Sequence, residues 1–109
     1  MAWRVRDRAT FEALRRSPHR SRRGPVTVTY VGLGESGQPG VAYAVGRRVG
    51  GAVIRNRVRR RLRAVVAELD GMLPGAYLVA AGPESRGATY LELQQHVTEA
   101  VAAASRRCR

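Results

Sequence analysis

The sequence between Arg47 and Arg63 holds eight arginines and not one acidic residue. Guanidinium groups are planar and always charged, they bind phosphate in a bidentate manner, and they can stack on bases. A helix over the second part of this stretch would place Arg55, Arg59 and Arg63 on one ridge, where like charges repel by about 0.2–0.5 kcal/mol per pair. Because solvation alone would favour mixed signs on a helix face, this ridge predicts an external polyanion as its partner.

The whole chain shares this charge imbalance. Its 20 basic residues are all arginine and face 8 acidic residues, which gives a net charge of +12 over 109 residues. Nucleic acid is the commonest partner of such a surface, while an anionic membrane or a ribosome would be alternatives. The hydrophobic share of 44% is ordinary for a globular protein, so the charge does not indicate disorder.

The remaining ionisable groups do not form a pattern typical of catalysis. No metal-ligand partner stands at useful spacing from His19 or His96, so we expect both to be surface residues. Cys108 is expected to be an inert tail residue. We therefore expect no catalytic residue and no metal site in this chain. The acids are scattered along the sequence: Asp7, Glu12, Glu35, Glu68, Asp70, Glu84, Glu92 and Glu99.

In the first half of the chain, hydrophobic patterning predicts a short helix and two strands. Residues 4–16 carry a small apolar face and end before Pro18, as a helix would. Residues 26–31 and 41–45 alternate with period two across a turn-rich connection, which predicts a β-hairpin. Residues 15–23 are basic and unpatterned and are expected to be an exposed connection.

The second half predicts a helix, a strand and a final helix. An apolar stripe on the first of these helices ends near Gly71, a buried strand follows at residues 76–81, and Thr89 with Glu92 has the form of a capping box. The stripes comprise Val58, Leu62, Val65, Val66 and Leu69, then Leu93, Val97, Ala100, Val101 and Ala104. The predicted order is α-β-β-α-β-α, with room for a short additional strand before the hairpin.

We expect one domain over residues 1–109, with a short basic N-terminal arm and a basic C-terminal tail. No hydrophobic run approaches the ~20 residues of a membrane span. No secretory signal is visible either, so a cytoplasmic protein is expected.

The central block resembles the signature of the bacterial ribonuclease P protein. That signature has a basic pair, then Val/Ile-Gly-x-Ala-Val, then Arg-Asn-Arg, then a basic helix. Here Arg47 and Arg48 stand where the family usually has two lysines, and Arg55-Asn56-Arg57 matches the central triplet unchanged. The resemblance covers most of the chain, although only this block is diagnostic.

The resemblance implies a fold and a set of partners. The fold would be an α+β two-layer sandwich of order α-β-β-β-α-β-α, similar to a ribosomal-protein domain, with a left-handed βαβ crossover. The catalytic RNA of ribonuclease P would hydrolyse precursor tRNA with Mg²⁺, and the chain alone would bind no cofactor. Residues implied to bind the catalytic RNA are Arg55, Asn56, Arg57, Arg59, Arg60 and Arg63. Residues implied to bind the 5′ leader of precursor tRNA are Phe11, Arg15, Tyr30, Tyr43, Arg47 and Arg48.

Some alternatives stay open at this point. Arg15 stands where the family often has a second aromatic residue, so leader binding would be more electrostatic here. Tyr30 and Tyr43 could equally belong to the core, as aromatic residues on strands often do. A purely structural RNA-binding protein and a nonspecific binder of polyanions or membrane surfaces are the competing functions.

Overall fold

The computed structural model describes residues 3–5, 7–32 and 39–106. The elements in chain order are β1 (Trp3–Arg4), α1 (Arg8–Arg16), β2 (Arg20–Arg23), β3 (Val26–Val31), β4 (Gly40–Val45), η1 (Arg47–Val49), α2 (Ala52–Ala67), β5 (Ala76–Ala81), η2 (Pro83–Gly87) and α3 (Tyr90–Arg106). Within the described residues, no helix is both long and apolar enough to cross a bilayer.

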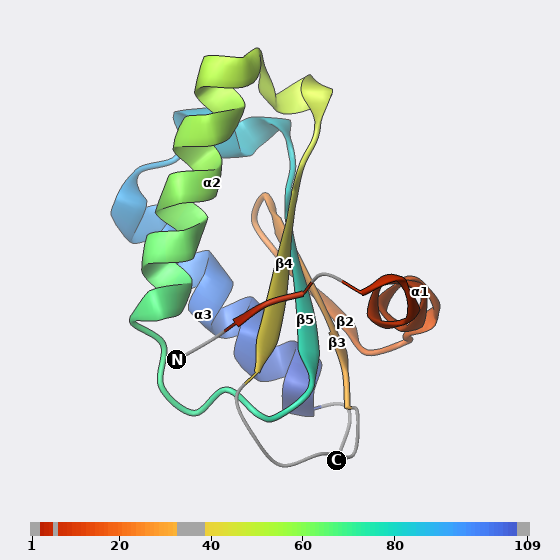
Figure 1. Ribbon diagram of the computed structural model, residues 1–109. Coiled ribbons are helices and arrows are strands. Elements are labelled where there is room, and N and C mark those ends of the chain that lie inside the picture. Colours follow the sequence, from red (N-terminus) through yellow and green to blue (C-terminus); the bar gives the residue numbers. More distant parts are fainter. Residues whose placement is uncertain (1–2, 6, 33–38, 107–109) are drawn as a thin grey trace.

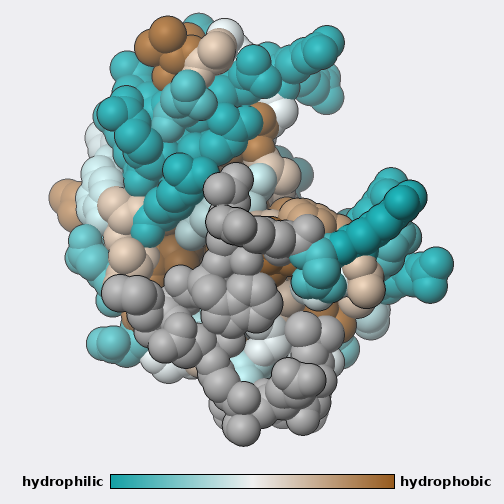
Figure 2. All heavy atoms as spheres, in the orientation of Figure 1, coloured by the Kyte–Doolittle hydropathy of each residue, from teal (hydrophilic) through white to brown (hydrophobic). Residues whose placement is uncertain are grey.

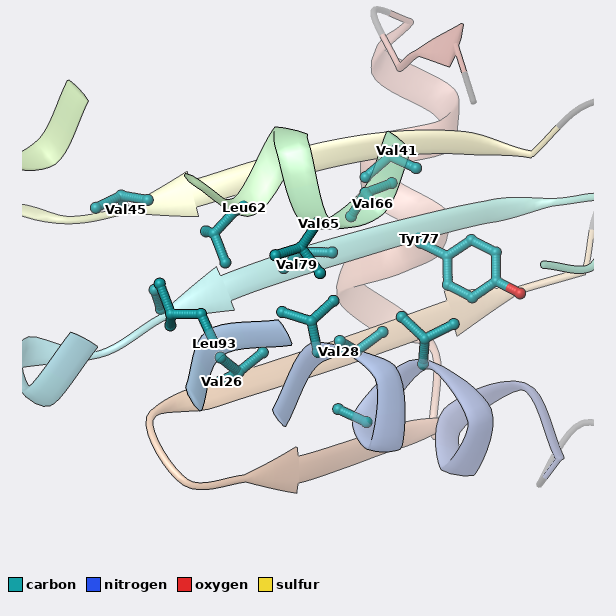
Figure 3. Close-up of a cluster of buried hydrophobic side chains, with 14 of the residues drawn as sticks. Val26, Val28, Val41, Val45, Leu62, Val65, Val66, Tyr77, Val79 and Leu93 are labelled. Carbon is teal, nitrogen blue, oxygen red and sulfur yellow. The ribbon is translucent and has the colours of Figure 1, made fainter. Parts of the chain in front are cut away.

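The strands form one sheet of order β1-β4-β5-β3-β2, with helices on both faces. Helices α2 and α3 cover one face and α1 covers part of the other (Figure 1). The larger core fills the space between the sheet and α2 with α3, where Leu62, Tyr77 and Leu93 are fully buried (Figure 3). A smaller cluster around Leu14 lies beneath α1. The mixed α+β architecture predicted from the resemblance is confirmed.

The predicted hairpin of residues 26–31 with 41–45 is wrong. Strand β5 lies between β3 and β4, antiparallel to the first and parallel to the second. Strand β5 is apolar along its length and mostly buried on both faces, as is typical of a central strand, and it pairs with a strand on each side. The hairpin of this fold instead joins β2 to β3 through Gly24, whose φ of 55° suits a tight turn. The segment expected to be an exposed connection therefore contains the additional strand, β2.

The connection from β4 through α2 to β5 is a left-handed crossover. The two strands are parallel neighbours, and α2 lies on the face that they share with the larger core. In Figures 1 and 3, an observer on the helix side with both strands pointing up sees β5 to the left of β4. Right-handed connections account for about 98% of such units, so general rules alone would have given the opposite hand.

Helix boundaries follow from side-chain caps. Helix α1 begins at Arg8 rather than at residue 4, because the Asp7 carboxylate accepts hydrogen bonds from the backbone N–H of Thr10 at 3.0 Å and from its hydroxyl at 2.6 Å. These bonds hold the pKa of Asp7 below its ordinary value. The capping box predicted before α3 is confirmed: the Thr89 N–H donates to Glu92 Oε1 at 2.8 Å, and the Glu92 N–H donates to Thr89 Oγ1 at 3.1 Å.

Both predicted apolar stripes are confirmed as the inward faces of α2 and α3. Every member of the α3 stripe is buried, and so are Val58, Leu62, Val65 and Val66 of α2. Leu69 lies beyond the end of α2 at Ala67 and is only partly covered, so the predicted α2 stripe extended past the helix. Tyr30 joins this core from β3, with only 4% of its surface exposed. Its ring centroid lies 4.7 Å from that of Tyr77, and its hydroxyl donates to the carbonyl of Pro74 at 2.5 Å. Of the two readings left open for Tyr30, the structure supports the core.

Replacing Tyr30 with phenylalanine tests this assignment. The Tyr30→Phe variant keeps the ring contact with Tyr77 but leaves the carbonyl of Pro74 without its donor. We expect the free energy of unfolding to fall by about 1 kcal/mol in urea titrations, with unchanged RNA binding. Tyr43→Phe is the matched control and should change stability less. A loss of RNA affinity in Tyr30→Phe at wild-type stability would contradict the core assignment.

Candidate RNA interface

The arginines of α2 fall into groups that face different ways. Arg59 and Arg63 follow each other by four residues and lie on the side of the helix nearest β4. Arg57 and Arg61 form a second pair at the same spacing on another side. There the guanidinium of Arg61 donates to the carbonyl of Ala88 at 3.0 Å, just before α3. Arg61 thus ties two elements together, whereas Arg57 stays exposed.

A depression of about 420 Å³ lies between α1 and α2 at the edge of β4. Three consecutive residues of β4 line it, and successive strand residues point to opposite faces of a sheet. The depression must therefore wrap around the strand edge, which β1 covers only at Gly40 and Val41. Figure 2 shows a hollow between the hydrophilic side chains over α2 and those over α1. The lining residues are Val5, Phe11, Val41, Ala42, Tyr43, Arg59 and Arg63.

Two aromatic rings contribute to this cleft, as we call the depression from here on. Phe11 is 38% exposed on α1, which is unusual for so large an apolar side chain. Tyr43 is half-buried on β4, and the guanidinium carbon of Arg63 lies 5.7 Å from the centre of its ring. Burial raises the pKa of Tyr43 to about 12, against the opposing effect of Arg63. The phenol is therefore neutral at physiological pH and able to donate a hydrogen bond.

A second depression, of about 460 Å³, lies on the outer surface of α2. It is lined by Val53, Asn56, Arg59, Arg60 and Arg63. The Arg59 guanidinium donates to Asn56 Oδ1 at 2.9 Å, which orients it on the helix surface. Arg59 and Arg63 line both depressions. The cleft thus brings together residues that the family resemblance assigned to two different RNAs: Arg59 and Arg63 to the catalytic RNA, and Phe11 and Tyr43 to the leader.

Arg55 begins the predicted ridge, and its side chain is half-buried, as is that of Arg59, whereas Arg63 is exposed. The Nε of Arg55 is fully buried with no hydrogen-bond partner among the described residues. Two of the three ridge arginines are therefore partly covered by the protein itself.

Arg47 and Arg48 are exposed on η1, while Val49 anchors the turn in the core. Gly50 follows with a φ of 153°, and a Cβ there would lie 3.0 Å from Ile54 Cδ1. This close approach fixes how η1 leads into α2. Neither arginine lines the cleft of Phe11.

The structure gathers some predicted leader-binding residues and separates others. Phe11 and Tyr43 lie together in the cleft, whereas Tyr30 lies in the core. Arg15 is exposed one turn beyond Phe11 and forms an ion pair with Glu12 at 3.5 Å, outside the cleft lining. The apolar lining residues Val5, Val41 and Ala42 were not predicted as part of the site. The strand that contains Val41 and Ala42 was expected, but its periodic pattern does not show which edge of the strand stays open.

The other ionisable residues stay apart. Among the described residues, no three histidine, cysteine, aspartate or glutamate side chains come close enough to share a metal ion. His96 is half-buried against the turn at Gly24 and not a surface residue as expected, and His19 is also half-buried. Glu35 and Cys108 lie outside the described residues.

Comparisons with known proteins agree on one family. The model of the Ribonuclease P family matches residues 1–105. The ribonuclease P protein component of Nocardioides sp. is 44% identical over 96 residues, covering 84% of this chain and 82% of the relative. The component from Acidothermus cellulolyticus is 39% identical over 95 residues, covering 84% of this chain and 78% of the relative.

Solved structures show the same fold. The RNase P protein of Staphylococcus aureus superposes with a TM-score of 0.82 at 21% identity, covering 95% of this chain and 96% of that one. The RNase P protein of Thermotoga maritima gives a TM-score of 0.75 at 17% identity, covering 88% and 92%. Together with the Arg55-Asn56-Arg57 triplet at the head of the basic helix, these matches show that the chain belongs to the Ribonuclease P protein family.

Proposed function

We propose that this chain binds the catalytic RNA of ribonuclease P through the outer surface of α2 and the 5′ leader of precursor tRNA in the cleft. The observation that carries the proposal is that the cleft combines two aromatic rings with Arg59 and Arg63 of the Arg-Asn-Arg helix. An aromatic face stacks on an unpaired base while guanidinium groups follow the phosphates, which gives sequence-tolerant binding of a single strand.

The two RNAs would share one basic ridge. Asn56 and Arg60 line the outer surface of α2, Arg57 is exposed on the adjoining side, and all three would face the catalytic RNA. Arg59 and Arg63 lie between that surface and the cleft, so they would contact both partners. Arg47, Arg48 and Arg15 are exposed outside the cleft lining and would add to the positive field that attracts the leader.

In this proposal the phosphodiester bond would be hydrolysed on the RNA, and Mg²⁺ bound by that RNA would supply an activated water and stabilisation of negative charge. The protein's part is electrostatic and positional. Its arginines neutralise phosphates that would otherwise repel each other where leader and catalytic RNA come together. Its cleft holds the leader in one place and thereby fixes where the scissile bond lies.

Reconstitution tests the proposal directly. Purified protein alone should cleave nothing, and added to the cognate catalytic RNA it should accelerate cleavage of precursor tRNA at low magnesium. The complex should also bind precursor tRNA more tightly than mature tRNA, because only the precursor carries a leader. Equal rates with and without protein at low magnesium would overturn the proposal. Equal affinity for both tRNAs would favour a purely structural RNA-binding protein instead.

Arg57 and Arg61 form a matched pair for testing the side of α2 that adjoins this outer surface. Arg57→Ala should weaken binding to the catalytic RNA at unchanged stability, because its side chain is exposed. Arg61→Ala removes the same charge but also the hydrogen bond to Ala88, so it should lower the melting temperature more than the RNA affinity. Filter binding and thermal unfolding of both variants measure this. If Arg57→Ala melts several degrees lower with unchanged RNA affinity, Arg57 has a structural role.

Phe11 is the test residue for the cleft. Its large exposed fraction means that Phe11→Ala should cost little stability, yet it removes a stacking surface worth ~1–3 kcal/mol per base. The preference of the complex for precursor over mature tRNA should fall by about tenfold, as measured from the two dissociation constants. Leu91→Ala, which truncates another exposed apolar side chain on α3, is the control. If the Phe11→Ala variant keeps the wild-type preference for precursor over mature tRNA, Phe11 does not stack on the leader.

A further inference from the structure

A second group of arginines lies at the opposite edge of the sheet, on β2. Arg20, Arg22 and Arg23 are all exposed there. Among the described residues, the one ion pair joins Arg15 to Glu12. The three arginines of β2 therefore form no ion pair with a described carboxylate. An edge strand with charged residues resists pairing with other strands, but a mixture of lysine, glutamate or proline would serve as well.

The side chains of β2 divide between the two faces of the sheet. Ser21 is buried on the face that packs against α3, so its neighbours Arg20 and Arg22 project on the face of α1. Arg23 is held separately, since its guanidinium donates to Ser21 Oγ at 3.0 Å and to the carbonyl of Arg22 at 2.9 Å. Arg20 and Arg22 are thus directed toward the same face as the cleft residue Phe11.

Helix α1 covers only part of that face. Beyond it, small side chains form the floor of a depression of about 420 Å³, whose lining includes Thr27 and Ala80 with Arg22 at one end and Arg48 at the other. Arg22 also lines a neighbouring depression of about 470 Å³ together with Arg20, Ser17 and Pro18. Arg22 thus lines both hollows, which together extend from Arg48 to Arg20 across the open half of the sheet; we call them the groove.

The groove connects the predicted leader-binding residue Arg48 to the far edge strand. Three strand spacings separate β4 from β2, which is about 14 Å across the sheet. We infer that the leader leaves the cleft, crosses this groove, and places phosphates of its upstream nucleotides on Arg20 and Arg22. This inference rests on the proposed leader binding and extends it to a second basic surface.

The chemistry of the groove favours a sugar–phosphate backbone over a base-reading site. Its described lining has no aromatic ring to stack on a base, and its floor of small side chains lets a strand approach closely. Guanidinium groups bind phosphate without regard to base identity. Glu84 lines the same hollow and repels phosphate, so the strand would run nearer to Arg22. Binding here should depend on leader length and not on leader sequence.

The experiment compares precursor tRNAs that differ only in leader length. The wild-type protein in complex with catalytic RNA should bind a long leader several-fold more tightly than a short leader that ends in the cleft. The variant Arg20→Gln with Arg22→Gln should lose this gain and keep the preference for the short leader over mature tRNA. The salt dependence for the long leader should also become shallower by about 1.4, because each lost single-strand phosphate contact contributes about 0.7.

Two controls make the outcome specific. Arg86→Gln with Arg106→Gln removes the same charge from η2 and from the end of α3, and it should keep the gain from the longer leader. Arg20→Lys with Arg22→Lys keeps the charge and should restore most of the gain, while thermal unfolding verifies that every variant is folded.

Three outcomes would overturn the inference. They are a long-leader gain that persists in the glutamine variant, no such gain in the wild-type complex, or a glutamine variant that loses affinity for the catalytic RNA alone. The last would assign β2 to the other RNA. A wild-type complex that does not distinguish even a short leader from none would instead refute the proposed function itself.

Discussion

The burial of one side of α2 against the sheet holds the basic surface together. Eight arginines within seventeen residues repel one another, by about 0.2–0.5 kcal/mol for each close pair. Each fully buried valine or leucine of the apolar stripe contributes about 1.5–3 kcal/mol in the opposite direction. Val58, Leu62 and Val65 are each at most 1% exposed, so the stripe outweighs the repulsion. The protein can therefore keep a surface that is electrostatically unfavourable until an anion covers it.

The position of β5 determines where that surface lies. Because β5 is central and parallel to β4, α2 must cross over the sheet between them, and its arginines come to the open edge of β4. The left-handed crossover places α2 on the face opposite α1, so the cleft forms around the strand edge and not on one face. A hairpin of β3 with β4 would have removed this edge and the cleft with it.

The sequence predicted the local features of this fold better than its pairings. Apolar stripes and the capping box depend on spacing along one helix, and both were found, although Leu69 falls beyond the end of α2. Strand pairing depends on segments far apart in the chain, and a period-two pattern within one strand does not determine which other strand pairs with it. For the same reason the pattern could not separate Tyr30, in the core, from Tyr43, at the cleft, although both lie on alternating strands. Arg20 and Arg22 were missed because a basic strand has no apolar alternation.

The sharing of Arg59 and Arg63 between two depressions has a thermodynamic consequence. An arginine side chain carries about 2 kcal/mol of rotamer entropy, part of which is lost when it is immobilised. When a first partner immobilises both guanidinium groups, a second partner binds without this loss of side-chain entropy, and its affinity is higher. By thermodynamic linkage, the second partner raises the affinity of the first by the same factor. In the proposed complex, two side chains on one helix would therefore make binding of the two RNAs cooperative, without any movement of the backbone.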